Sequence, residues 1–249
     1  MPAETYEAEG LEVPVETWGS GTDTLVFLPG LGCAPQEYAR GLALAARKRR
    51  IVVLDLSFRG RADLPTSIEQ YLRVVNGVCE QVAPGAPRAG HSFGGLLALL
   101  HPGPAIACAP SVPARVALPH TFGRAVVLQL REYVGLEGRA AVPYALRTTR
   151  DYIVKAVRSP RALFSITSAL NDDPGTRPAR AEAAVVYLCR RDEMYRRREY
   201  DGYFGPSSTA AYEFLEVDEG HDWPATHADR FAERIDAALE SLARPPRVR

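Results

Sequence analysis

The chain has 249 residues, of which 46% are apolar and 24% charged, and its 30 basic side chains balance 30 acidic ones. A chain of this size can bury roughly 70 to 75% of the surface that it exposes when unfolded, so a single soluble globular domain is expected. With a net charge of zero there is no electrostatic attraction to nucleic acid or to an anionic membrane surface, and we expect neither as a partner.

The N-terminal residues and the cysteines indicate a cytoplasmic protein. Residues 1–10 contain three glutamates and no basic side chain, which is unlike a secretory signal or a transit peptide. No apolar run approaches the length of a transmembrane helix, about 18 residues. The four cysteines, Cys33, Cys79, Cys108 and Cys189, lack the close spacing of a zinc site or a disulfide framework. We expect them to be reduced thiols in the core.

Strand-like and helix-like patterns alternate along most of the chain. Short apolar runs predict strands at residues 24–28, 51–56, 105–109, 184–188 and 212–217, and helical spacing predicts helices at 36–46, 67–82 and 228–242. Strands that are apolar nearly throughout are typical of a sheet covered on both faces. The predicted fold class is therefore α/β, with a mostly parallel twisted sheet and helices on both faces.

One long segment interrupts this alternation. Residues 112–181 carry mostly helical patterns, at 122–133, 142–157 and 161–170, and no convincing strand. Such a segment within an α/β domain predicts an inserted helical cap. We therefore expect residues 1–111 and 182–249 to form the N-terminal and C-terminal parts of one core, with residues 112–181 as the cap.

The strongest local motif is Gly90-His91-Ser92-Phe93-Gly94, followed by an apolar helical run. A serine on a sharp turn from strand to helix needs small residues two positions before and after it, because a Cβ there would collide with the neighbouring strand and helix. The turn presents the Ser92 hydroxyl above the sheet. It also directs the backbone N–H of Phe93 toward the place where a negative oxygen develops during acyl transfer. Ser92 is therefore the candidate nucleophile and Phe93 a candidate oxyanion-hole donor.

A serine nucleophile needs a histidine base and an acid that orients the histidine. His221 follows the predicted strand 212–217 and precedes the last helix, so it lies at the edge of the sheet where ligands bind. His91, beside Ser92, is expected to point away from it. Asp192 follows strand 184–188 at the same edge. Ser92, Asp192 and His221 are the predicted catalytic triad.

Five motifs in this order resemble the α/β-hydrolase family, in the branch that uses a serine nucleophile. They are Phe27-Leu28-Pro29-Gly30-Leu31-Gly32, Asp55-Leu56-Ser57-Phe58-Arg59-Gly60-Arg61, the Ser92 turn, the Asp192 turn and Gly220-His221. The resemblance implies that the N–H of Leu31 is the second oxyanion-hole donor and that a cap covers the pocket. No motif indicates a cofactor or a metal ion.

Three functions follow from these residues. The first is a serine hydrolase that cleaves an ester or another activated acyl bond of a small-molecule substrate through an acyl-enzyme on Ser92. The second is a thioesterase, acyltransferase or cyclase acting on a carrier-bound natural-product intermediate, with an acyl carrier protein docked on the arginine-rich segment 190–198. The third is a ligand-binding member of the fold without turnover. The sequence leaves the oligomeric state open.

Overall fold

The computed structural model describes residues 3–56, 65–113, 178–192, 195–204 and 212–244, with isolated residues 146, 149–150, 153–154, 157 and 170. The predicted cap, residues 112–181, lies almost wholly outside the described residues, as do the predicted helices 122–133 and 161–170 and residues 57–61 of the second motif. The isolated residues between 146 and 157 are helical. The division into core and cap stays a prediction.

The described residues form one eight-stranded sheet, in the order β1-β2-β4-β3-β5-β6-β7-β8. The strands are β1 (Glu4–Ala8), β2 (Leu11–Trp18), β3 (Thr24–Leu28), β4 (Arg50–Leu54), β5 (Arg88–His91), β6 (Ala105–Cys108), β7 (Ala184–Cys189) and β8 (Tyr212–Val217). β1 and β2 pair antiparallel, β2 is antiparallel to β4, and every other pair is parallel. The predicted fold class, a mostly parallel sheet with helices on both faces, is confirmed.

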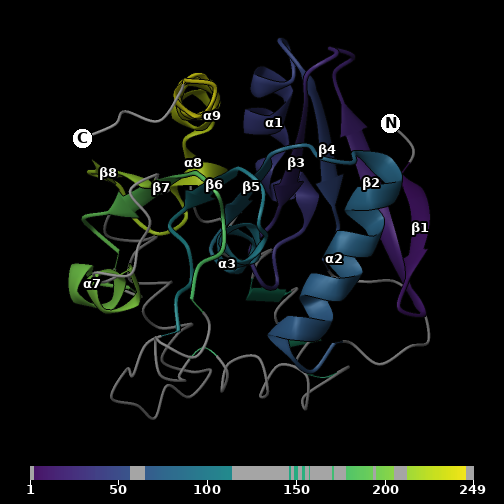
Figure 1. The fold of residues 1–249 in the computed structure, drawn as a ribbon, viewed down its shortest axis with the longest axis horizontal. Helices are drawn as coiled ribbons and strands as arrows, with labels where there is room; N and C mark the ends of the chain where they lie inside the picture. Colours follow the sequence, from purple (N-terminus) through teal and green to yellow (C-terminus); the bar gives the residue numbers. More distant parts are fainter. Residues whose placement is uncertain are drawn as a thin grey trace.

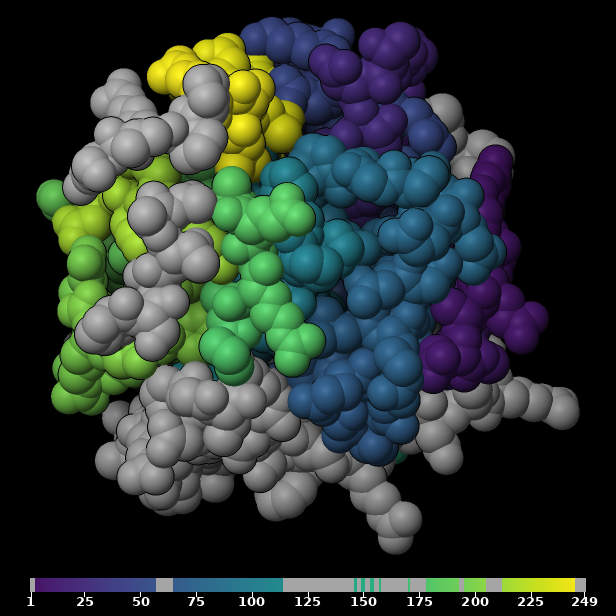
Figure 2. All heavy atoms as spheres, viewed as in Figure 1, coloured from purple at the N-terminus to yellow at the C-terminus, as the bar shows by residue number. Residues whose placement is uncertain are grey.

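The helices cover both faces of this sheet. They are α1 (Ala39–Ala45), preceded by a 3-10 turn at Pro35–Tyr38, α2 (Ile68–Val82), α3 (Phe93–Leu100), α7 (Arg197–Phe204), α8 (Trp223–Thr226) and α9 (Ala228–Leu242). Helix α1 packs against α9 on one face, and α2 and α3 lie on the other (Figure 1). In the space-filling view, α2 covers the part of the visible face between α3 and β1, which lies at the edge (Figure 2).

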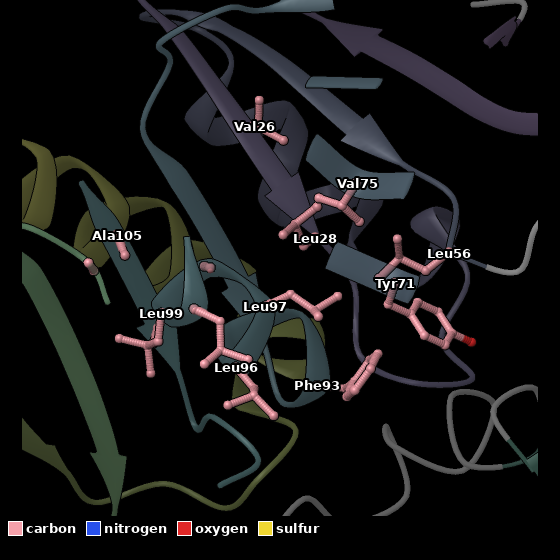
Figure 3. Packing of buried hydrophobic residues seen from close by; sticks show 14 of the residues in the cluster. Val26, Leu28, Leu56, Tyr71, Val75, Phe93, Leu96, Leu97, Leu99 and Ala105 are labelled. Carbon is pink, nitrogen blue, oxygen red and sulfur yellow. The ribbon is translucent and has the colours of Figure 1, made fainter. Parts of the chain in front are cut away.

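Alternation along the central strands divides the core into two layers. Val26 and Leu28 of β3 pack with α2 and α3, as Figure 3 shows, while Leu25 and Phe27 of the same strand pack with α1 and α9. Successive side chains of a strand point to opposite faces, so a strand buried on both sides must be apolar throughout. That requirement explains the unbroken apolar runs in the sequence.

Local signals set the ends of several elements close to the expected places. Ser67 caps α2, because its Oγ accepts the N–H of Gln70 at 3.2 Å. The run after Ser92 forms α3, which ends at Leu100 before Pro102 and Pro104. Strand β6 stops at Cys108, one residue early, because Ala109 has a positive φ of 44° and leaves the strand conformation.

The sequence patterns did not predict the N-terminal hairpin of β1 and β2. Its turn lies at Glu9 and Gly10, which both have positive φ angles, as tight hairpin turns require. β2 buries Leu11 and the run from Val13 to Val15, exposes Glu12, and is half-buried from Glu16 to Trp18. Helices α7 and α8 were not predicted either. The remaining differences are small: β4 spans 50–54 instead of 51–56, β7 extends to Cys189, and the helix expected at 36–46 begins as a 3-10 turn.

Candidate active site

The turn that carries Ser92 joins β5 to α3 in a strained conformation. Ser92 has φ 52° and ψ −117°, which a non-glycine residue rarely adopts. A Cβ on Gly90 would lie 2.2 Å from the carbonyl oxygen of Gly94, and a Cβ on Gly94 would lie 2.1 Å from that of Leu28. Both contacts are with backbone that cannot rotate away. The steric reason predicted for the two glycines is therefore confirmed.

The structure brings Ser92, His221 and Asp192 into one hydrogen-bonded row. Nε2 of His221 lies 2.9 Å from Oγ of Ser92, and its Nδ1 lies 2.7 Å from Oδ2 of Asp192. The three residues follow β5, β8 and β7, whose parallel carboxyl ends meet at one edge of the sheet. These two contacts join positions that are 129 and 29 residues apart along the chain. Their catalytic roles stay a prediction.

The protons in this row have one consistent arrangement. A carboxylate can only accept, so Nδ1–H of His221 donates to Asp192 and its Nε2 is left to accept the hydroxyl proton of Ser92. The other oxygen of Asp192, Oδ1, accepts the N–H of Tyr195 at 2.8 Å. Asp192 and His221 are buried, whereas Ser92 is partly accessible. A base is therefore held, correctly oriented, beside a reachable hydroxyl.

Buried and half-buried ion pairs hold the loop that carries His221. Glu219, which is buried, accepts from Arg230 and, at 3.3 Å, from Arg234 of α9. The guanidinium of Arg234 also lies 4.5 Å from the ring centre of Trp223, whose side chain is fully buried. Glu219 therefore anchors the loop to α9. The carboxylate that hydrogen-bonds the His221 ring is that of Asp192.

The two predicted oxyanion-hole donors lie on neighbouring turns. Phe93 is the first residue of α3, so its N–H has no acceptor within the helix. Its ring packs edge-on against Tyr71 of α2, with centroids 5.0 Å apart, so the first turn of α3 is anchored to α2 (Figure 3). Leu31 follows β3 in a turn closed by the N–H of Cys33 on the carbonyl of Gly30, at 3.0 Å. Their role in binding an oxyanion stays a prediction.

His91 points away from Ser92, as expected, into a buried hydrogen-bonded row that the sequence did not predict. Its Nε2 lies 3.0 Å from the carbonyl oxygen of His221, so Nε2–H donates and Nδ1 is left as an acceptor. The hydroxyl of Tyr38 lies 2.7 Å from Nδ1 and accepts the N–H of Gly30 at 3.2 Å. One row of bonds thus joins the turn before Leu31 to the loop of His221.

In its neutral form His91 has both ring nitrogens hydrogen-bonded in this row. The surroundings disfavour the protonated, charged ring. Burial, followed by the nearby His221, lowers the pKa of His91 to about 4. Asp222, whose Oδ1 lies 3.8 Å from Nε2, acts in the opposite direction but does not offset burial. His91 is therefore neutral at physiological pH.

Two residues that the sequence reasoning missed lie directly against the row of Ser92. Oγ of Ser111 is 3.0 Å from Oγ of Ser92, and its N–H donates to the Ser92 carbonyl at 2.9 Å. The hydroxyl of Tyr195 hydrogen-bonds Ser111. Ser111 follows β6 at the same sheet edge as the three candidate catalytic residues. This position after a parallel strand is the one feature of the sequence that could have predicted a role for Ser111 at the site.

The arginine-rich segment 190–198 is engaged by carboxylates. Arg190 and Arg197 both bond Glu216, Arg191 bonds Asp218 at 2.6 Å, and Arg198 bonds Glu199. A cavity of about 430 Å³ opens there, lined in part by Arg190, Arg191, Arg196, Arg197, Asp192 and Glu216. Neither Ser92 nor His221 lines it, so it lies behind the acid and away from the hydroxyl.

The four cysteines are buried and reduced, as expected. Within the described ranges, no group of three or more His, Cys, Asp or Glu side chains is placed to hold a metal ion. No helix in the same part of the chain is long and apolar enough to cross a bilayer.

A sequence profile of the alpha/beta hydrolase family matches residues 25–234. The chain belongs to this family. Solved structures with the same fold include an enol-lactonase from Burkholderia xenovorans LB400 (18% identity, 97% of this chain and 100% of that chain, TM-score 0.66). Another is a meta-cleavage product hydrolase from Pseudomonas fluorescens IP01 (15% identity, 96% of this chain and 98% of that chain, TM-score 0.70). A third is a bromoperoxidase from Bacillus anthracis (15% identity, 95% of this chain and 100% of that chain, TM-score 0.70). Comparison with curated protein sequences gave no match.

Proposed function

We propose that this member of the alpha/beta hydrolase family is a serine hydrolase that cleaves an ester or another activated acyl bond of a small molecule. The observation that carries the proposal is the row of Ser92, His221 and Asp192, joined at 2.9 and 2.7 Å on a strained turn that exposes the hydroxyl. The neighbouring structures bear names of different reactions, so they support the fold and do not select a substrate.

The proposed reaction has two halves. Ser92 attacks the acyl carbon while His221 takes its proton, and Asp192 stabilises the imidazolium that forms. The N–H groups of Leu31 and Phe93 stabilise the negative oxygen of the tetrahedral intermediate. His221 then protonates the leaving group, takes a proton from a water that attacks the acyl-enzyme, and returns it to Ser92 as the acid departs. No cofactor takes part in these steps.

The test is turnover and labelling at Ser92. The wild-type protein should hydrolyse p-nitrophenyl acetate or butyrate and should bind a fluorophosphonate probe stoichiometrically, with the adduct mapped to Ser92 by mass spectrometry. Ser92→Ala should lose both, with a fall in kcat of at least about a thousandfold. Ser241→Ala, a serine on α9 away from this edge, is the matched control and should keep both. Turnover by Ser92→Ala at the wild-type rate would refute the mechanism.

The same experiment separates the two alternatives. A ligand-binding protein without turnover would neither hydrolyse the esters nor take up the probe at any pH from 6 to 9. An enzyme acting on a carrier-bound thioester should lose activity on that substrate, and keep activity on small esters, when Arg196, Arg197 and Arg198 are changed to Glu. The ion pairs of Arg197 and Arg198 with carboxylates leave little net positive charge for an acidic carrier and favour the small-molecule substrate.

A further inference from the structure

The contact between Ser111 and Ser92 has only one consistent proton arrangement. The single hydroxyl proton of Ser92 is donated to Nε2 of His221, so Ser92 has none left for Ser111 at 3.0 Å. Ser111 must therefore donate to Oγ of Ser92. The hydroxyl of Tyr195 hydrogen-bonds Ser111 from another side. The nucleophile thus accepts a hydrogen bond on the side away from the base.

Backbone contacts hold this donor in place. Ser111 is buried, with 3% of its surface exposed, and its N–H bonds the carbonyl of Ser92. Tyr195 is also buried, and its N–H bonds Asp192. Burial raises the pKa of Tyr195 to about 12, so its hydroxyl keeps its proton at neutral pH. The two hydroxyls are therefore fixed relative to the nucleophile and to the acid.

We propose that Ser111, which is held against Ser92 by its backbone N–H and contacted by Tyr195, is a catalytic donor to Oγ of Ser92 that speeds the breakdown of the acyl-enzyme. This inference rests on the proposed hydrolase function. It concerns one step of that reaction, the departure of Ser92 from the acyl group.

The reason lies in how well Oγ accepts a hydrogen bond at each stage. In the free enzyme Oγ is a hydroxyl oxygen with available lone pairs. In the acyl-enzyme it is an ester oxygen whose lone pair is delocalised into the carbonyl, so the bond from Ser111 weakens. When water has added, the bond from carbon to Oγ breaks, its electron pair returns to Oγ, and the proton on Nε2 of His221 moves to it. The bond from Ser111 is regained as that electron pair arrives.

The acyl-enzyme is consequently the one state in which this hydrogen bond is poor. Removing the Ser111 hydroxyl stabilises the acyl-enzyme relative to the free enzyme and to the transition states on either side. Attack of free Ser92 on substrate, which begins and proceeds with a good bond, is little changed. The loss of one neutral hydrogen bond corresponds to a roughly 2- to 10-fold slower deacylation.

The experiment compares wild type with Ser111→Ala, Ser111→Thr and Tyr195→Phe on p-nitrophenyl acetate. For Ser111→Ala we expect kcat and KM to fall together by about 2- to 10-fold with kcat/KM unchanged, wherever deacylation limits turnover. The acylated fraction of Ser92, measured by intact mass after acid quench, should rise. Ser111→Thr keeps the hydroxyl and should restore wild-type values. Tyr195→Phe should also lower kcat and KM and raise the acylated fraction, each by less than Ser111→Ala does.

Matched controls are Ser241→Ala and Tyr6→Phe, which change a serine and a tyrosine away from this sheet edge. A fall in kcat/KM with no rise in the acylated fraction would mean that Ser111 only supports the fold of the turn, and would overturn the inference. If Ser111→Ala does not fold, an unchanged acylated fraction in Tyr195→Phe overturns it equally. If wild type fails to acylate Ser92 at all, the proposed function fails, which is a distinct result.

Discussion

The buried neutral His91 makes the stability of the protein depend on pH in a defined window. Unfolded, His91 should titrate near its ordinary value of 6.5, whereas burial and the neighbouring His221 lower its folded pKa to about 4. Between these values the unfolded chain binds more protons than the folded one. The stability due to neutral His91 is therefore fully present above pH 6.5, falls as the pH drops, and is exhausted near pH 4.

The magnitude follows from the two pKa values. One unit of pKa difference is worth about 1.4 kcal/mol, so the fall from 6.5 to about 4 corresponds to about 3 kcal/mol of unfolding free energy. The structure gives the cause. Protonated Nδ1 of His91 would direct an N–H at the hydroxyl of Tyr38, which already accepts from Gly30, and only Asp222 and Asp192 supply opposing charge.

The perturbation is His91→Gln, whose amide can donate to the His221 carbonyl and accept from Tyr38 but cannot titrate. Urea unfolding of both proteins, followed by fluorescence from pH 8 to pH 4, gives the free energy of unfolding at each pH. Because all other groups titrate in both proteins, the difference between the curves isolates His91. We expect the variant to be about 1 kcal/mol less stable above pH 7 and about 2 kcal/mol more stable near pH 4.

Two curves that stay parallel from pH 8 to pH 4 would show that the change in proton uptake does not belong to His91. His101→Gln is a comparison. Burial and then Arg88 lower the pKa of His101 to about 4 as well. Its side chain is only partly buried, so solvent screening should make its share smaller than that of His91.

Three further outcomes are expected. Gly94→Ala would place a Cβ 2.1 Å from a backbone oxygen, so it should cost about 1 to 3 kcal/mol of stability and reduce ester hydrolysis by displacing the turn before Leu31. Ser67→Ala removes the cap of α2 and should cost about 1 kcal/mol, measured by urea unfolding, without changing kcat. Burial raises the pKa of Cys79 to about 11 and that of Cys108 to about 12, so a disulfide reagent at pH 8 should label them only after unfolding.

Each of these has a simple contrary result. If Gly94→Ala were as stable as wild type, the turn would have room for a Cβ at this position, which would contradict the close backbone contacts. Ser67→Asp, which keeps a capping oxygen, should retain most of the stability, and a loss as large as that of Ser67→Ala would contradict the role of the cap. Rapid labelling of either cysteine in the native protein would contradict its burial.

The sequence determined the fold class and three candidate catalytic positions, because each depends on local rules. Unbroken apolar runs require burial on both faces, and the glycines around Ser92 require a tight turn. Asp192 and His221 each follow a parallel strand, and the carboxyl ends of such strands meet at one edge whatever the details of packing. The order of motifs along the chain was therefore enough to predict that these side chains meet.

The contacts of Ser111, Tyr195 and His91 were decided only by tertiary structure. Ser111 touches Ser92 because β6 pairs beside β5 with Cys108 opposite His91, and a serine after a strand carries no signal of that register. His91 meets Tyr38 because β5 also pairs with β3, which sets the turn at Gly30 over it. Such contacts depend on which strands are neighbours and on how side chains fill the space between them, and no local pattern encodes either.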